Sequence, residues 1–378
     1  MAAKVAVYAK PPEVLVKVLE HSHPLVSLPL VRRLRFAAGF PGGISEHARI
    51  LWCSPLTLEE YLSTCSAHDD GVEAEPRIDE NAGKDHRELR VNGKAPPFAA
   101  AYLDFSRGPE TELWIYSSME GRLSGISSTQ DEMGIRAKER WGTSHEEGDD
   151  EELGREREDI ASAVALLHEV KRQQDLYFAP GTTRANEREY PTVLVGNLNE
   201  ILRKRLAAPD VGMDLVSTGL YDKWIFEIAK LPDADLTDDI GTVNGHRWVW
   251  DVVRREDIAF TISRTNIPRR ERTMKLLPST ALYTNNGTPV AWAFLGPDSS
   301  LSSLHCEEPY RGRGIAKAVA VKLLRDHLGD YNDDAYIGWA DVAPDNVQSQ
   351  GVCRSLNGKP LWQISWSRLD LNRSFPEG

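Results

Sequence analysis

The sequence predicts an α/β fold in two halves, because segments with strand and helix periodicity alternate along the whole chain. Its length of 378 residues suggests two domains, or one domain with a large extension. The strongest local signal is a strand at 301–306 that runs into a glycine-rich turn and then into a helix with one apolar face. A second signal is Asn286-Gly287 between two apolar runs, which is typical of a β-hairpin.

The first half, residues 1–207, is predicted to be α/β with two charged insertions, 67–97 and 127–158. The second insertion contains the run 146–152, in which six of seven residues are acidic. Such runs are typical of disordered segments, and a docking segment is the alternative. Asp159 is a plausible cap for the helix that follows. The expected elements are a helix at 12–19, a strand at 48–52, a hairpin of 98–105 and 112–117, a helix at 159–173, a strand at 192–195 and a helix at 197–206.

The second half is assigned to residues 208–378, with the turn-rich run 231–239 as its boundary loop. Trp248, Trp250 and Val252 are expected on one face of its first strand. The expected elements are strands at 248–253, 279–283, 289–295, 301–306 and 335–342, and helices at 256–262, 269–277, 314–327 and after Asn346. The segment 361–366 ends this region.

The turn at 311–314 (Arg-Gly-Arg-Gly) has the features of a pyrophosphate site. Glycines let the backbone approach a ligand, and the N–H groups and positive dipole end of the following helix favour a phosphate. Arg311 and Arg313 add charge-assisted donors. An ordinary glycine turn is the alternative. Two known phosphate loops fit poorly: no Gly-x-x-x-x-Gly-Lys-Ser/Thr motif is present, and Lys317 stands where a dinucleotide loop needs its third glycine.

The pattern Arg-x-x-Gly-x-Ala over 311–316 resembles the coenzyme A pyrophosphate loop of the GNAT N-acyltransferase superfamily. The order of elements over 248–368 resembles a GNAT domain, and 346–366 looks most like the glycine N-acyltransferase branch. The resemblance implies a mixed, mostly antiparallel central sheet flanked by helices. The first half lacks this loop, so a degenerate GNAT-like half or an accessory layer is expected there.

The same resemblance implies acetyl-CoA or another acyl-CoA as co-substrate, with no metal. Backbone N–H groups around 304–306 would polarise the thioester carbonyl, as preorganised donors do. Asn346 and Ser349 would hydrogen-bond the pantetheine arm or cap their helix. The residues expected to bind the co-substrate are Leu304, Cys306, Arg311, Gly312, Arg313, Gly314, Ile315, Ala316, Asn346 and Ser349.

Acyl transfer to an amine also needs a general base. The glutamate that serves in the glycine N-acyltransferase branch is replaced here by Ser300, and the usual tyrosine acid by Cys353. Asp341, on the same strand face as Trp339, is the first candidate base, and a helix cap is its alternative role. His305 is the second candidate, and an ordinary strand residue is its alternative role.

Composition limits the possible partners. A net charge of −12 argues against nucleic acid, and no apolar run is long enough to span a membrane. Four separated cysteines suggest reduced thiols and a cytoplasmic setting. We therefore expect an acyl-CoA-dependent N-acyltransferase, most simply an acetyltransferase, that acts on a small amine or amino-acid-like acceptor. A non-catalytic acyl-CoA-binding or scaffold protein is the alternative. Four arginines could bind an acidic group of the acceptor or simply form a solvated helix face: Arg264, Arg269, Arg270 and Arg272. The sequence has no signal for an oligomeric state.

Overall fold

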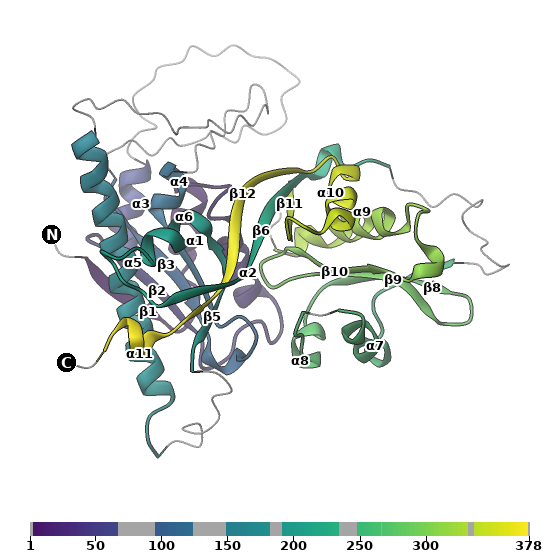
Figure 1. Cartoon of the computed structure of the whole chain (residues 1–378), viewed down its shortest axis with the longest axis horizontal. Helices are drawn as coiled ribbons and strands as arrows, with labels where there is room; N and C mark the ends of the chain where they lie inside the picture. The colour runs from purple at the N-terminus through teal and green to yellow at the C-terminus, as the bar shows by residue number, and fades with distance from the viewer. Residues whose placement is uncertain are drawn as a thin grey trace, which may run out of the picture.

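The computed structural model describes residues 3–66, 95–123, 149–181, 191–233, 248–265, 267–331 and 336–376. Two sheets form its centre (Figure 1). The larger has eight strands in the order β1-β2-β3-β4-β5-β12-β6-β11, and the smaller has four in the order β10-β9-β8-β7. Neighbouring strands pair antiparallel except β4 and β5, which pair parallel. The predicted α/β class, with a mixed and mostly antiparallel sheet, is confirmed.

The strands have these bounds: β1 Lys4–Tyr8, β2 Arg49–Ser54, β3 Ala99–Leu103, β4 Leu113–Ser117, β5 Val193–Asn199, β6 Leu215–Glu227, β7 Trp248–Asp251, β8 Ser279–Thr284, β9 Pro289–Leu295, β10 Leu301–Cys306, β11 Ile337–Val342 and β12 Lys359–Leu369. The α-helices have these bounds: α1 Glu13–Ser22, α2 Leu28–Gly39, α3 Leu58–Ser66, α4 Ser118–Leu123, α5 Asp149–Tyr177, α6 Glu200–Leu206, α7 Ile258–Ser263, α8 Glu271–Met274, α9 Ile315–His327, α10 Val347–Ser355 and α11 Leu371–Ser374. Short 3₁₀ helices fill several of the connections between them.

The first half buries its strands on both faces. Side chains alternate along β2, so that Ile50 and Trp52 pack with α1, α2 and α3, whereas Leu51 and Cys53 pack with α5 and α6. The predicted β3–β4 hairpin is confirmed by its register, which runs from Ala99 opposite Ser117. The predicted helix face over 159–173 also lies in this core.

Helix α5 corrects two predictions about the charged insertion. Residues 149–158, predicted to be disordered, form its first turns, and Arg155 donates a hydrogen bond to the carbonyl of Ala95 at 2.5 Å. Asp159 lies inside the helix rather than at its cap. Its buried carboxylate pairs with Arg122 and accepts a hydrogen bond from Ser118. These tertiary contacts stabilise a helical segment that its composition alone does not favour. The other residues of the two predicted insertions, apart from 95–97, lie outside the described residues.

Two long strands connect the halves (Figure 1). Strands β6 and β12 pair antiparallel from Leu215 opposite Leu369 to Ile225 opposite Lys359. One edge of β12 also pairs with β5 of the first half, and the far end of β6 pairs with β11 of the second. A division at 207/208 therefore remains a prediction, because β12 from the end of the chain lies in the sheet of the first half.

The second half places helices on both faces of its small sheet. Helices α9 and α10 share one apolar cluster with β8, β9 and β10, and α7 and α8 cover the opposite face. The predicted hairpin turns at Gly287, whose φ is 85°. Strand β7 ends at Asp251, so Val252 does not share a strand face with the two tryptophans as predicted and is 53% exposed.

Strands β10 and β11 belong to different sheets. The pairing partner of β10 is β9, and that of β11 is β6. The sheet of the second half is thus open between β10 and β11, immediately before the glycine-rich turn.

Candidate functional site

The glycine-rich turn has the conformation that its sequence predicts. Gly312 and Gly314 have φ values of 77° and 76°, a region that side chains with a Cβ rarely adopt. A Cβ built on either glycine would meet no atom within 4 Å, so the turn borders open space. Outside helices and strands, the hydrogen bonds between described residues use none of the N–H groups of Gly312, Arg313 and Gly314. Ile315 and Ala316 form the first turn of α9, whose N–H groups have no acceptor within the helix.

The two arginines of the turn have different positions. Arg311 donates from Nε to the carbonyl of Cys306 at 2.9 Å, which ties the turn to β10. Arg313 is exposed at the head of α9. The turn thus combines free backbone donors with positive charge at the N-terminus of a 13-residue helix, which is the arrangement that binds phosphate groups.

Strand β10 carries a bulge directly before the turn. Its register with β9 shifts between Ser302 and His305, and Ser303 adopts a φ of 52°. Leu304 lies within the bulge. Beyond it, Glu307 donates to the carbonyl of Val290 at 2.8 Å. In an antiparallel pair the N–H groups alternate in direction, so the N–H of Cys306 points away from β9 and into the opening.

His305 stacks on Trp292, with ring centroids 4.6 Å apart. Its Nε2 lies 3.5 Å from a carboxylate oxygen of Glu307. Burial lowers the pKa of His305, and Glu307 partly offsets that effect. The imidazole is therefore neutral at pH 7 and chemically able to accept a proton, although one ring face is covered.

Asp341 forms a buried ion pair that the sequence did not reveal. Its Oδ1 lies 2.6 Å from Nζ of Lys223, the residue directly opposite on β6. The Lys223 side chain is fully buried, and that of Asp341 is 7% exposed. Burial raises the pKa of Asp341, and the Lys223 charge opposes that rise. The predicted alignment with Trp339 is confirmed, because Nζ of Lys223 lies 5.5 Å from the Trp339 ring centroid.

The helix after β11 is capped by Asn346, whose side chain accepts a hydrogen bond from the N–H of Ser349 at 3.0 Å. The alternative role of Asp341 as the cap is therefore wrong. Of the two roles considered for Asn346, capping is the one observed. Cys353, at the position of the usual tyrosine, is buried in the core, and burial raises the pKa of its thiol to about 12.

Residues from both halves surround Asp341. Arg32 of α2 lies over the Trp339 ring, 4.7 Å from its centroid, and donates to Ser299 at 2.8 Å. Asn197 of β5 donates its side-chain amide to Asp298 at 3.1 Å. These contacts place the first half directly against the face of β11 that carries Asp341.

The four arginines predicted to bind an acidic group or to be solvated have separate environments. Arg264 pairs with Glu307 at 2.8 Å, and Arg272 donates to the carbonyls of Ser106 and Arg107. Arg269 donates to Ser302 of β10 at 2.9 Å and has a buried Nε. Burial lowers the pKa of Arg269. Arg269 is therefore the member of this group with a buried guanidinium bonded to β10 itself.

Several buried polar atoms around the opening have no hydrogen-bond partner among the described residues. Lys223 and Asp341 have only each other, as an ion pair. Native proteins rarely leave such atoms unpaired, so water or a ligand is expected to meet them. The other atoms are Ser303 Oγ, Arg32 Nε, Arg269 Nε and Trp339 Nε1.

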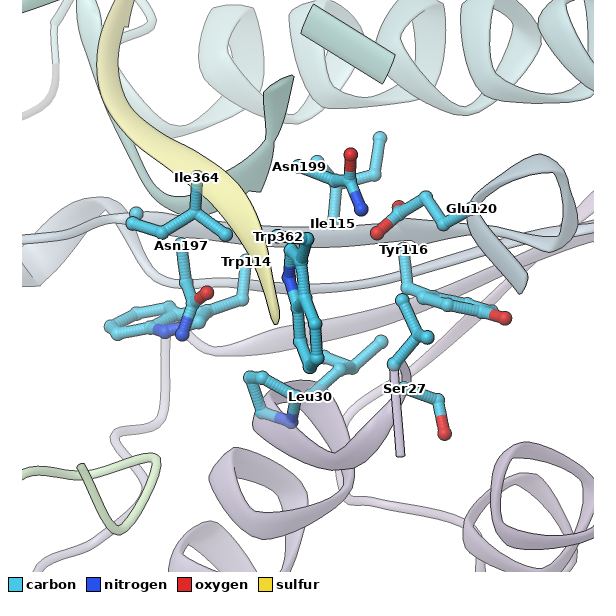
Figure 2. Close-up of a pocket in the computed structure, with 13 residues that line it drawn as sticks. Ser27, Leu30, Trp114, Ile115, Tyr116, Glu120, Asn197, Asn199, Trp362 and Ile364 are labelled. Carbon is cyan, nitrogen blue, oxygen red and sulfur yellow. The ribbon is translucent and has the colours of Figure 1, made fainter. Parts of the chain in front are cut away.

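The first half has a comparable opening between β4 and β5, whose parallel register has the single pair Leu113 and Val195. Figure 2 shows the side chains that line it. Trp362 of β12 stands in this opening, and the volume open to the centre of a water molecule is about 10 Å³. That volume holds no more than one water. Strand β4 leads directly into the six-residue α4 rather than into a glycine-rich turn. The lining residues are Val26, Ser27, Pro29, Leu30, Trp114, Ile115, Tyr116, Glu120, Gly196, Asn197, Asn199, Trp362 and Ile364.

Glu120 is the titratable acid of this first opening. One carboxylate oxygen accepts the N–H of Ser117 at 2.9 Å. Burial raises the pKa of Glu120 to about 8. Nearby, Tyr116 and His23 share a hydrogen bond of 2.7 Å, and burial lowers the pKa of His23 to about 4. At neutral pH the opening is therefore largely uncharged and filled by its own side chains.

Comparisons with known proteins agree with this architecture. Residues 2–224 match the family model of the acyl-CoA N-acyltransferase verG N-terminal domain. No curated protein matches the chain. A solved Drosophila protein is 10% identical with a TM-score of 0.52, over 97% of this chain and 99% of that one, which shows the fold. A tandem GNAT protein from the clavulanic acid biosynthesis pathway is 11% identical over 100% of both chains, with a TM-score of 0.46. Among the described residues, no helix is long and apolar enough to cross a membrane.

Proposed function

The chain belongs to the family of the acyl-CoA N-acyltransferase verG N-terminal domain, and we propose that it transfers an acyl group, most simply an acetyl group, from coenzyme A to an amine. The observation that carries this proposal is the glycine-rich turn at the head of α9, beside the opening between β10 and β11. A turn with free N–H groups beside such an opening can hold a pyrophosphate while the thioester extends between the strands.

The residues on the two sides of the opening suggest how the reaction proceeds. The N–H of Cys306 donates to the thioester carbonyl and stabilises the oxyanion that forms when the amine nitrogen attacks. The C–N bond forms, the C–S bond breaks, and coenzyme A leaves as a thiolate. The amine proton passes to a base and then, through solvent, to the thiolate. Since Cys353 replaces the usual tyrosine acid and keeps its own proton, we assign it no catalytic role.

Asp341 is the preferred base, and His305 is the second. Burial makes the Asp341 carboxylate a stronger base than an exposed one, and its oxygens have no hydrogen-bond partner among the described residues beyond the Lys223 ion pair. His305 is neutral, but its stacking on Trp292 restricts it. A general base of this kind contributes about a hundredfold or more to the rate.

We infer that the acceptor is a small amine or an amino-acid-like molecule, as in the glycine N-acyltransferase branch that the tail of the second half resembles. Arg32 and Arg269 support this choice because each has a buried Nε without a partner, which could bind an acceptor carboxylate. The net charge of −12 disfavours nucleic acid as the acceptor. A cytoplasmic setting remains a prediction, supported by four cysteines that are all free.

The competing proposal is a non-catalytic acyl-CoA-binding protein. It is favoured by Ser300, which stands at the position of the branch glutamate and donates to Asp298 at 2.7 Å. Free-thiol release from acetyl-CoA over a panel of amines and amino acids separates the two. Turnover with any amine supports the enzyme. Tight binding of coenzyme A by calorimetry, without turnover on any amine, would favour the binding protein.

A further inference from the structure

We propose that Lys223 keeps Asp341 ionised as the proton acceptor, so that β6, one of the two strands that connect the halves, completes the reaction site of the second half. Lys223 is a positioning residue in this scheme, because it acts through Asp341 and not on the substrate. The inference rests on the proposed function, and specifically on Asp341 as the base. It goes further by assigning a role to Lys223, which lies on β6 and therefore far before the glycine-rich turn in the sequence.

The geometry of the pair supports this role. Lys223 and Asp341 are directly opposite in the antiparallel register of β6 and β11, so their side chains leave the sheet on the same face. The ammonium and carboxylate are 2.6 Å apart, and neither has another hydrogen-bond partner among the described residues. The Asp341 carboxylate is thus paired with a single cation, and its oxygens can still accept a proton.

A buried carboxylate without a cation would be neutral, because burial disfavours the charged form. Lys223 provides the opposing interaction, whereas Asp298 adds to the rise in the Asp341 pKa. The other charged or titratable groups that face this region are Arg32 of α2, Arg269 before α8 and Cys353 of α10. Among all of these, Lys223 is the cation in direct contact with Asp341.

The pair is poorly explained by stability alone. Burying two charges costs several kcal/mol, and apolar residues of similar volume are often at least as stabilising. Trp362 lies opposite Lys223 on the other side of β6, and Ile225 and Trp339 pack nearby, so an apolar pair would fit these surroundings. A carboxylate held ionised beside an opening has a use in proton transfer that an apolar pair lacks.

In the proton step, the attacking amine nitrogen loses one proton to Asp341 as the C–N bond forms. Asp341 becomes a neutral acid beside Lys223. The proton then leaves to solvent, and coenzyme A acquires one in turn. No oxidant, reductant or metal takes part in this step.

The test compares pH profiles of kcat/KM for the wild type, Lys223→Met and Lys223→Arg, with acetyl-CoA and the best amine of the panel. Lys223→Met removes the ammonium. The acidic limb of its kcat/KM profile should move to higher pH by about one unit or more, and turnover at pH 7 should fall about tenfold. Lys223→Arg keeps the charge and should keep the limb within about half a unit of the wild type. A merely structural lysine would change stability without moving the limb.

Controls separate the possible failures. Calorimetry with coenzyme A reports whether each variant is folded. If Lys223→Met does not bind coenzyme A, Lys223→Gln, which can still hydrogen-bond Asp341 without charge, takes its place and should show the same shift. If the wild type turns over and the acidic limb does not shift in Lys223→Met or Lys223→Gln, this inference is overturned and the proposed function is not. Absence of turnover by the wild type on every amine overturns the proposed function together with it.

Discussion

The two openings of this molecule each follow a run of four antiparallel strands, β1–β4 and β7–β10, but they have different contents. In the first half, β4 and β5 separate beyond Leu113 and Val195, and the space between them is occupied by Trp362. In the second half, β10 and β11 do not pair at all, and the glycine-rich turn follows. The first opening has room for no more than one water, whereas the second is lined by buried polar atoms that lack partners. A repeated topology therefore does not imply a repeated ligand site.

The strands that pass between the halves create this difference. Trp362 on β12 and Lys223 on β6 are opposite each other in register. Trp362 of β12 fills the first opening. Lys223 of β6 forms an ion pair with Asp341 at the second. Each half thus receives from a shared strand a side chain at its opening, a tryptophan in the first and a lysine paired with Asp341 in the second.

The largest expected difference concerns the two buried carboxylates. Asp341→Asn keeps the shape of the second opening and should lower turnover about a hundredfold at neutral pH, with coenzyme A binding intact. Glu120→Gln makes the same chemical change in the first opening and should alter turnover less than about twofold, because no reaction is expected there. Steady-state kinetics measure both. Near-normal turnover in Asp341→Asn would transfer the role of base to His305 or to water.

The second prediction tests the glycine-rich turn. Gly314→Glu adds a side chain at a φ of 76° and a negative charge where the pyrophosphate is expected. Affinity for coenzyme A should fall by about tenfold or more in calorimetry, a loss of at least about 1.4 kcal/mol. Gly154→Glu, on α5 of the first half, adds the same charge in open space and is the matched control. Unchanged affinity in Gly314→Glu would remove the turn from the site.

The third prediction uses the pH dependence of stability. Glu120 in the folded protein has its pKa raised to about 8 from an ordinary value of 4.5, so the folded state holds this proton more tightly than the unfolded state. Its contribution to stability is complete below about pH 4.5 and should be lost as pH rises towards 8, by about 1.4 kcal/mol per pH unit. Glu120→Gln should remove this slope in urea denaturation from pH 5 to 8. A wild-type slope that persists in the variant would mean that Glu120 ionises freely.

The smallest effect is expected from opening the first half. Trp362→Ala should leave coenzyme A bound at one equivalent per chain, with affinity changed less than about threefold, because the first half still lacks a glycine-rich turn. Calorimetric stoichiometry is the measurement. Two equivalents in the variant would show that Trp362 alone had closed a second co-substrate site, and that the halves differ less than their loops suggest.

The features of the site that depend on short sequence patterns could be predicted from the sequence. The turn at 311–314, helix α9 and the shared face of Trp339 and Asp341 depend on glycine conformations, helix periodicity and strand alternation over a few residues. The helical start of α5 could not be predicted from the sequence, because its acidic composition resembles that of a disordered segment. Contacts with distant segments, such as Arg205 with Glu156, stabilise it.

The sequence by itself therefore determined the α/β class, the order of the elements and the left-handed glycine conformations of one turn, since each depends on short-range geometry. Only the tertiary structure decided which opening is filled by a tryptophan and what the carboxylate beside the other one contacts. Lys223 precedes Asp341 by more than a hundred residues, and Trp362 follows Trp114 by more than two hundred, so no local pattern links them. Strand pairing between the halves brings these residues together, because the backbone hydrogen bonds of β6 and β12 must be satisfied in both sheets.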